Sequence, residues 1–212
     1  MKIALQFILV FVLLPFGMYS QTEQQKIIDV FKDYKSAILN DRGTEALKLI
    51  DKRTVDYYSG ILIAIKQSDK EAIDQLSLMD KLMILIIRQQ VSNEEILKFS
   101  GESLLLYAFD NGMVGKNGVV DVDLGKVTVS DDFAKAQLII KGKEESLYFH
   151  FYKEKDWKLN LTSLFPISNI AIREMVEESG KEENDFILFL VEIMSKRKLK
   201  ENIWNPIKNA TN

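Results

Sequence analysis

His150 is the only histidine of the 212-residue chain, and histidine is the side chain that most often exchanges protons near neutral pH. It lies in the segment 146–152, SLYFHFY, in which apolar and polar residues alternate. In a strand this alternation places Phe149 and Phe151 on one face and His150 on the opposite face. Helices must cover the apolar face, so we expect His150 to lie outside any pocket between helices and sheet. We therefore predict that His150 is not catalytic.

Tyrosine and carboxylate side chains are the other groups that could do acid–base chemistry, because the chain contains no cysteine. Tyr57, Tyr58 and Tyr107 fall in a helical region that could line a pocket, which makes them our candidate ligand-pocket residues. The alternative is that their rings pack in the core or at its rim while the hydroxyls reach water. No acidic residue interrupts an apolar strand face, so we assign no catalytic residue.

Asp121 and Asp123 come nearest to the spacing of metal ligands. The segment that follows them lacks the glycine and the bidentate glutamate of a calcium loop. Both residues alternate with valines, so we expect them to project together from a polar sheet face. We predict no metal site and no cofactor.

Residues 1–20 have the order of a secretory signal peptide: Lys2, an apolar run over residues 3–16, and a break at Pro15 and Gly17. The run is shorter than the about 20 apolar residues that span a bilayer. We predict cleavage after residue 20 and export to the periplasm or the extracellular space, with no stable membrane span afterwards. The alternative is an uncleaved N-terminal anchor.

Helical periodicity dominates residues 22–109. The pattern Ser/Thr-x-x-Glu/Gln at Thr22, Ser68 and Ser92 predicts three helix starts. The second of these should open a long helix over residues 69–88. We expect these N-terminal helices to supply the layer that covers the sheet.

From residue 119 the period of the apolar residues changes from about 3.6 to 2. Alternating segments separated by turns predict an antiparallel meander, with strands over residues 119–130, 134–142, 146–152 and 157–162. Helical periodicity returns after Pro166, ends once at Gly180, and continues in a helix whose predicted apolar face holds Phe186, Ile187, Phe189, Leu190, Ile193 and Met194. We therefore predict an α+β fold in which N-terminal helices pack on a curved antiparallel sheet and C-terminal helices follow.

Two segments are similar to those of the nuclear-transport-factor-2-like superfamily: residues 27–50, IIDVFKDYKSAILNDRGTEALKLI, and residues 148–162, YFHFYKEKDWKLNLT. The resemblance implies a cone-like domain, over residues 21–163, of helices packed into a strongly bent sheet. It also implies that residues 164–212 form a helical extension similar to that of some uncharacterised secreted bacterial members. The superfamily includes isomerases, dehydratases, polyketide cyclases, transport adaptors and immunity proteins, so the fold alone does not decide the function.

The net charge of −3 argues against a nucleic-acid partner, which would require a basic face. Our leading hypothesis is a secreted or periplasmic, non-enzymatic binding module for a small apolar ligand or a protein partner. One alternative is a small-molecule lyase or isomerase that uses Tyr and Asp or Glu. A second is an immunity or inhibitor protein against an exported toxin. The exposed sheet face could also support a homodimer.

Overall fold

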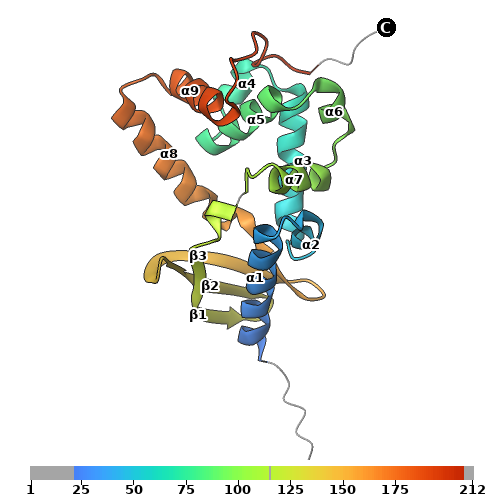
Figure 1. Cartoon of the computed structure of the whole chain (residues 1–212), viewed down its shortest axis with the longest axis vertical. Coiled ribbons are helices and arrows are strands. Elements are labelled where there is room, and N and C mark those ends of the chain that lie inside the picture. The colour runs from blue at the N-terminus through green and yellow to red at the C-terminus, as the bar shows by residue number, and fades with distance from the viewer. Residues whose placement is uncertain (1–21, 115, 208–212) are drawn as a thin grey trace, which may run out of the picture.

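The computed structural model of the protein describes residues 22–114 and 116–207, and the predicted signal peptide lies outside these ranges. The elements follow in the order α1 (Glu23–Leu39), α2 (Gly43–Leu47), α3 (Lys52–Gln67), α4 (Lys70–Asp74), α5 (Leu78–Gln90), α6 (Asn93–Lys98), α7 (Gly101–Asp110), η1 (Lys116–Gly118), β1 (Val122–Ser130), β2 (Phe133–Ile140), β3 (Lys143–Lys153), β4 (Trp157–Asn160), η2 (Leu161–Leu164), α8 (Phe165–Ser179) and α9 (Glu183–Ser195). This is the predicted α+β fold, with helices before and after a curved antiparallel sheet (Figure 1). None of the helices in the described ranges combines the length and the apolar character needed to cross a bilayer.

Side-chain caps decide where the N-terminal helices begin. The Thr22 hydroxyl accepts a hydrogen bond from the backbone N–H of Gln25 at 3.2 Å and caps α1. The Ser92 hydroxyl caps α6 in the same way, through the N–H of Glu95 at 3.3 Å. Two of the three predicted helix starts are therefore confirmed, and each cap contributes about 1 kcal/mol.

The predicted single helix over residues 69–88 is wrong, because the structure divides it into α4 and α5. Asp69, not Ser68, caps the first of them. Ser77 caps the second, where its hydroxyl accepts a hydrogen bond from the backbone N–H of Asp80 at 3.2 Å. Serine competes for local backbone groups in this way and favours a helix start over a helix interior. The apolar spacing runs on across the break, so periodicity alone did not reveal it.

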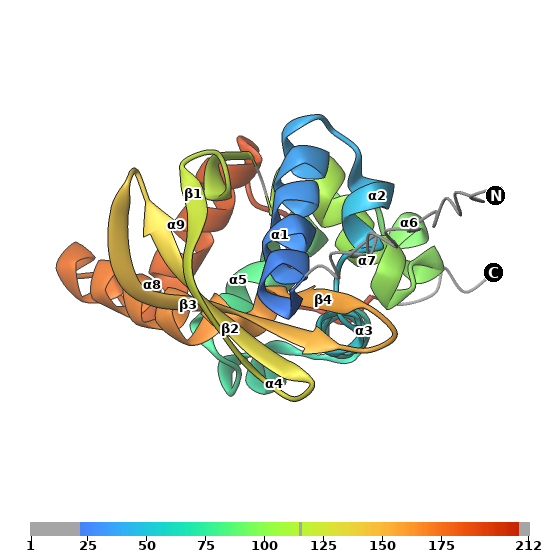
Figure 2. The same ribbon diagram turned by 90° about the horizontal axis from the view of Figure 1, so that it is seen from below.

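The strands pair in the order β1-β2-β3-β4, each antiparallel to the next, which confirms the predicted meander. Register shifts interrupt the pairing between Leu124 and Val127 of β1 and between Gln137 and Ile139 of β2. Irregularities of this kind increase the local bend and twist of a sheet. Figure 2 shows the resulting curvature, with the sheet bending around α1.

The concave face of the sheet carries the core. Phe149 and Phe151 of β3 are 6% and 0% exposed, which confirms that their face packs against the helices. The ring of Phe149 lies 5.6 Å from that of Phe31 in α1. The last strand ends at Asn160, two residues earlier than predicted, because the N–H of Leu161 turns to the Thr54 hydroxyl of α3 at 3.1 Å.

The predicted apolar face of the last helix is only partly correct. Phe186, Ile187 and Val191 are the buried residues of α9, which lies beside α5 (Figure 1). By contrast, Phe189, Ile193 and Met194 are 43%, 55% and 49% exposed. α9 packs mainly against α5, so the apolar residues that face α5 are buried and those on the other side of the helix stay exposed.

Candidate ligand-binding cavity

An open cavity of about 690 Å³ lies between the sheet and the helices. Its wall is built from α1, α3, the connection from α7 to β1, β3 and the start of α8. Most of the wall is apolar, with Phe149 from the sheet, Phe109 from α7, Val119 from the connection to β1, Leu161 from η2 and Phe165 from the start of α8. Its volume lies in the range of sites that hold small organic molecules.

Two phenols from neighbouring helices supply polar groups in this wall. Tyr34 of α1 is 0% exposed and Tyr58 of α3 is 2% exposed, and both line the cavity. Burial raises the pKa of each hydroxyl well above its usual range, and Tyr58 raises the pKa of Tyr34 further. Both therefore stay protonated near neutral pH and can donate a hydrogen bond.

The Tyr34 hydroxyl is buried and has no hydrogen-bond partner within residues 22–114 and 116–207. Leaving a buried donor unpaired costs about 1–3 kcal/mol. Most buried side-chain polar groups have a partner, so an exception in a cavity wall calls for an explanation. Tyr34 was not a candidate from the sequence, since it belongs to the apolar stripe of α1 and could not be told from a core residue.

Charged side chains lie only at the exposed mouth of the cavity, among the described residues that line it. Asp41 and Asp110 contribute carboxylates and Lys116 contributes an ammonium. The Lys116 Nζ lies 2.7 Å from Asp41 Oδ2, which ties η1 to the end of α1. The mouth therefore carries an excess of one negative charge, while the interior holds neutral groups only.

The structure separates the three predicted pocket tyrosines. Tyr58 lines the cavity, and Tyr57 and Tyr107 do not. The Tyr57 hydroxyl donates to the carboxylate of Asp80, and its ring packs at 5.1 Å from that of Phe165. Burial first and this carboxylate second raise the pKa of Tyr57. The Tyr57–Asp80 pair thus lies behind the cavity wall.

Tyr107 of α7 has a different environment. Its ring lies 5.6 Å from that of Phe99. Burial, and then the negative charge of Glu95, raise the pKa of its hydroxyl, while Arg197 opposes the shift. Both neighbours belong to the helical layer far from the sheet, so Tyr107 is a packing residue.

His150 lies on the convex face of the sheet, opposite the cavity. It pairs with Lys135 of β2 and Asn160 of β4, and its ring contacts that of Phe133 at 5.2 Å. Asp123, one of the two aspartates considered as metal ligands, forms an ion pair with Lys35 at 3.0 Å. No group of three or more potential metal ligands occurs within the described ranges.

Replacing His150 with glutamine is expected to change the free energy of unfolding at pH 7 by no more than about 0.5 kcal/mol. Burial, and then the charge of Lys135, lower the pKa of His150. The unfolded chain therefore binds the proton first as the pH falls, and the native state loses stability from about pH 6.5 downward. Urea unfolding at pH 7 and pH 5 should show a smaller loss on acidification for the variant than for the parent. A large loss of unfolding free energy in the variant at pH 7 would contradict the placement of His150 outside the core.

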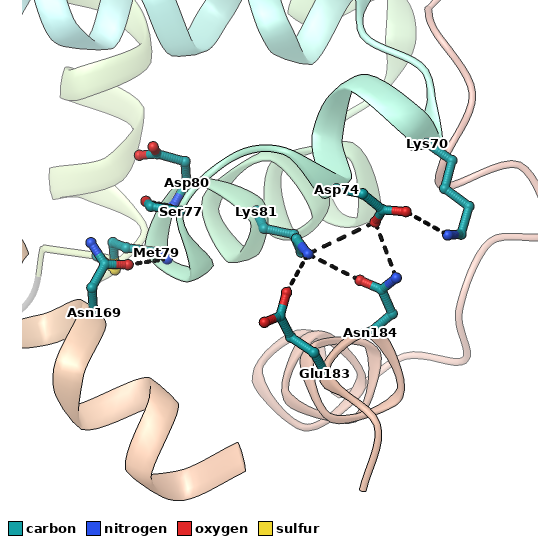
Figure 3. A network of polar contacts seen from close by, with 9 residues as sticks. All are labelled: Lys70, Asp74, Ser77, Met79, Asp80, Lys81, Asn169, Glu183 and Asn184. Atoms are coloured by element: carbon teal, nitrogen blue, oxygen red, sulfur yellow. Dashed lines mark hydrogen bonds and ion pairs between the residues drawn. The ribbon is translucent and has the colours of Figure 1, made fainter. Parts of the chain in front are cut away.

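An ion pair between a buried lysine and a partly exposed glutamate docks α9 onto the helices behind the cavity (Figure 3). Lys81 of α5 is 2% exposed, and its Nζ lies 2.5 Å from Glu183 Oε1 and 3.2 Å from Asn184 Oδ1. The Asn184 amide in turn donates to Asp74 Oδ1 at 3.0 Å. A hydrogen bond from Lys70 is the largest of the effects that lower the pKa of Asp74. The network joins α4, α5 and α9 into one unit.

A second contact fixes α8, which supplies part of the cavity wall. The Asn169 side-chain oxygen accepts a hydrogen bond from the backbone N–H of Met79 at 2.8 Å, at the start of α5 (Figure 3). Met79 and the first turn of α8, with Phe165 and Ser168, line the same cavity. The position of this wall therefore depends on a bond between residues 90 positions apart.

Comparisons of the chain with protein-family models, with curated proteins and with solved structures gave no match. The cavity is therefore the feature of this molecule that bears on its function.

Proposed function

We propose that the protein is a non-enzymatic binding module that holds a small, mainly apolar ligand in the cavity between sheet and helices. The observation that carries this proposal is the unpartnered Tyr34 hydroxyl in the wall of a cavity of about 690 Å³. Neighbouring side chains cover this hydroxyl, so a ligand whose hydrogen-bond acceptor moves them aside would satisfy the donor, and the apolar wall would bury the rest of the molecule.

The cavity favours binding over catalysis. A lyase or isomerase of the kind considered above needs a carboxylate beside the substrate in a protected site. The lining carboxylates, Asp41 and Asp110, are exposed at the mouth, and Asp80 is bonded to Tyr57 outside the lining. The protected interior offers neutral phenols, which bind and orient a ligand.

We also propose that the protein works outside the cytoplasm and belongs among the nuclear-transport-factor-2-like proteins. The first part rests on the signal-peptide pattern of residues 1–20. The second is supported by the order of helices and bent meander, which is the arrangement that the resemblance implies. Mass spectrometry of ligand that copurifies from the periplasmic fraction would identify the natural occupant.

Replacing Tyr34 with phenylalanine is expected to leave the protein as stable as the parent or up to about 1 kcal/mol more stable, because an unpaired buried donor is removed. The same variant should bind 2-octanone, a small ligand with one carbonyl acceptor, about 3–10-fold more weakly. Urea unfolding measures the first effect, and displacement of the neutral fluorophore Nile red measures the second.

Tyr107 provides the matched control, since Tyr107→Phe removes a phenol hydroxyl outside the cavity and should not change the affinity for 2-octanone. A Tyr34→Phe variant that is clearly less stable, with unchanged binding, would show that the hydroxyl serves the fold. Failure of the parent to bind the ketone would count against the proposal.

A further inference from the structure

A second, smaller cavity of about 90 Å³ lies in the helical layer between α3, α5, α7 and α9. Met83, Ile86 and Ile87 of α5 line it together with Leu104 and Ala108 of α7. Tyr58 is the one residue with a polar side-chain group among the described residues around it. We call this space the rear cavity and the larger one the front cavity.

The two cavities share part of their walls. Tyr58, Met79, Met113, Val114 and Phe165 line both of them. Methionine side chains are unbranched and change rotamer readily, so a partition that contains two of them can yield to a ligand. These shared residues separate the front cavity from the rear cavity. If the methionines move, the front cavity opens into the interior of the helical layer.

The shape and the charge of the combined space restrict the ligand. The rear cavity has room for about three methylene groups, taking each as about the 30 Å³ of a water molecule in the liquid. Apart from the Tyr58 phenol in the shared wall, the described residues that line it offer no partner for a charged or strongly polar end. At the mouth of the front cavity, Asp41 and Asp110 outnumber Lys116, which disfavours a carboxylate or phosphate there.

We infer that the ligand is an elongated, neutral molecule with a hydrogen-bond acceptor and an unbranched aliphatic chain. This inference rests on the proposed function. The acceptor lies in the front cavity near Tyr34 and Tyr58, and the end of the chain passes between Met79 and Met113 into the rear cavity. Ligands of this class include long-chain ketones, aldehydes and esters.

Chain length provides the test. 2-Tridecanone has five more methylene groups than 2-octanone, of which the rear cavity would hold about three, so the parent should bind 2-tridecanone about 50-fold more tightly. Ala108 is 4% exposed and lines the rear cavity only, so Ala108→Met should fill this space. In that variant the affinity for 2-octanone should stay within about 2-fold of the parent value, while most of the 50-fold preference for 2-tridecanone should disappear.

A second variant keeps the inference testable if Ala108→Met does not fold. Met83→Ala enlarges the rear cavity and should shift the preference toward 2-pentadecanone. Binding of 2-octanone without a gain for longer chains would overturn this inference and leave the proposed function standing. An Ala108→Met effect that is equal for both ketones would also overturn it. Absence of binding of either ketone would overturn the proposed function as well.

Discussion

Replacing Arg88 with alanine is expected to lower the free energy of unfolding by about 3–4 kcal/mol, a large part of the stability of an ordinary domain. Arg88 of α5 is 4% exposed. Its guanidinium donates to the carbonyls of Ser68 at 2.6 Å, Ile65 at 2.9 Å, Ile203 at 3.2 Å and Ala64 at 3.3 Å. Three of these carbonyls end α3, and the fourth belongs to the C-terminal segment.

The guanidinium has this role because it is the one side chain with enough fixed donors for several carbonyls. Burial lowers the pKa of Arg88 to about 10, which still leaves it charged at neutral pH. No carboxylate forms an ion pair with it within the described ranges. Alanine would leave several carbonyls without a donor and would free the segment around Ile203.

Urea unfolding measures the loss, and limited trypsin digestion reports the release of the C-terminal segment as faster cleavage near Lys198. Arg88→Lys keeps the charge but presents one ammonium group, so an intermediate loss is expected. Arg173 is exposed on α8, and Arg173→Ala should cost less than about 0.5 kcal/mol. A free energy of unfolding for Arg88→Ala within 1 kcal/mol of the parent value would refute the stabilising role assigned to the hydrogen bonds of Arg88.

The fold could be predicted from the sequence wherever local chemistry decides it. Alternation along residues 146–152 gave the correct faces of β3, and the caps at Thr22 and Ser92 gave correct helix starts. The break between α4 and α5 was missed because it depends partly on Asn169, which reaches the start of α5 from a distant part of the chain. Long-range contacts of this kind leave no trace in a periodic pattern.

The site was predictable only in part, for a related reason. Tyr57 and Tyr58 are adjacent in the sequence but point to different neighbours, since successive residues of a helix are about 100° apart. Which of them meets the cavity depends on how α3 packs against α5 and α7. Tyr34 has the spacing of a core residue, and only the three-dimensional surroundings reveal that its hydroxyl has no partner.

Replacing Asp51 with alanine is expected to lower the free energy of unfolding by about 3 kcal/mol, because the fully buried side chain accepts two hydrogen bonds. Asp51 is 0% exposed and caps α3, where its Oδ1 accepts a hydrogen bond from the backbone N–H of Thr54 at 2.9 Å. Its Oδ2 accepts a second one from the side-chain amide of Asn160 at 2.8 Å. Loss of the cap costs about 1 kcal/mol, and an unpaired buried amide adds about 1–3 kcal/mol.

The hydrogen bond between Asn160 and Asp51 connects the end of β4 to the start of α3. The backbone around it is tied in as well: Asp51 donates its N–H to the carbonyl of Leu159 at 3.0 Å, and Leu159 donates its N–H to the carbonyl of Leu49 at 2.8 Å. Asn160 pairs with His150 across the strands, and alternation with Leu159 would place its side chain on the outer face, whereas the structure buries Asn160 at 4% exposure against Asp51. The strand end turns inward there because α3 supplies a carboxylate for the amide.

Asp69 offers the matched comparison, because it caps α4 through the N–H of Ala72 at 3.0 Å but is exposed. Asp69→Ala should therefore lose only the cap, about 1 kcal/mol. The excess loss in Asp51→Ala measures the bond to Asn160, and a double-mutant cycle with Asn160→Ala should show coupling of about 1 kcal/mol or more. Equal losses for the two aspartates, with no coupling to Asn160, would mean that the buried bond to Asn160 adds nothing to the stability that the helix cap provides.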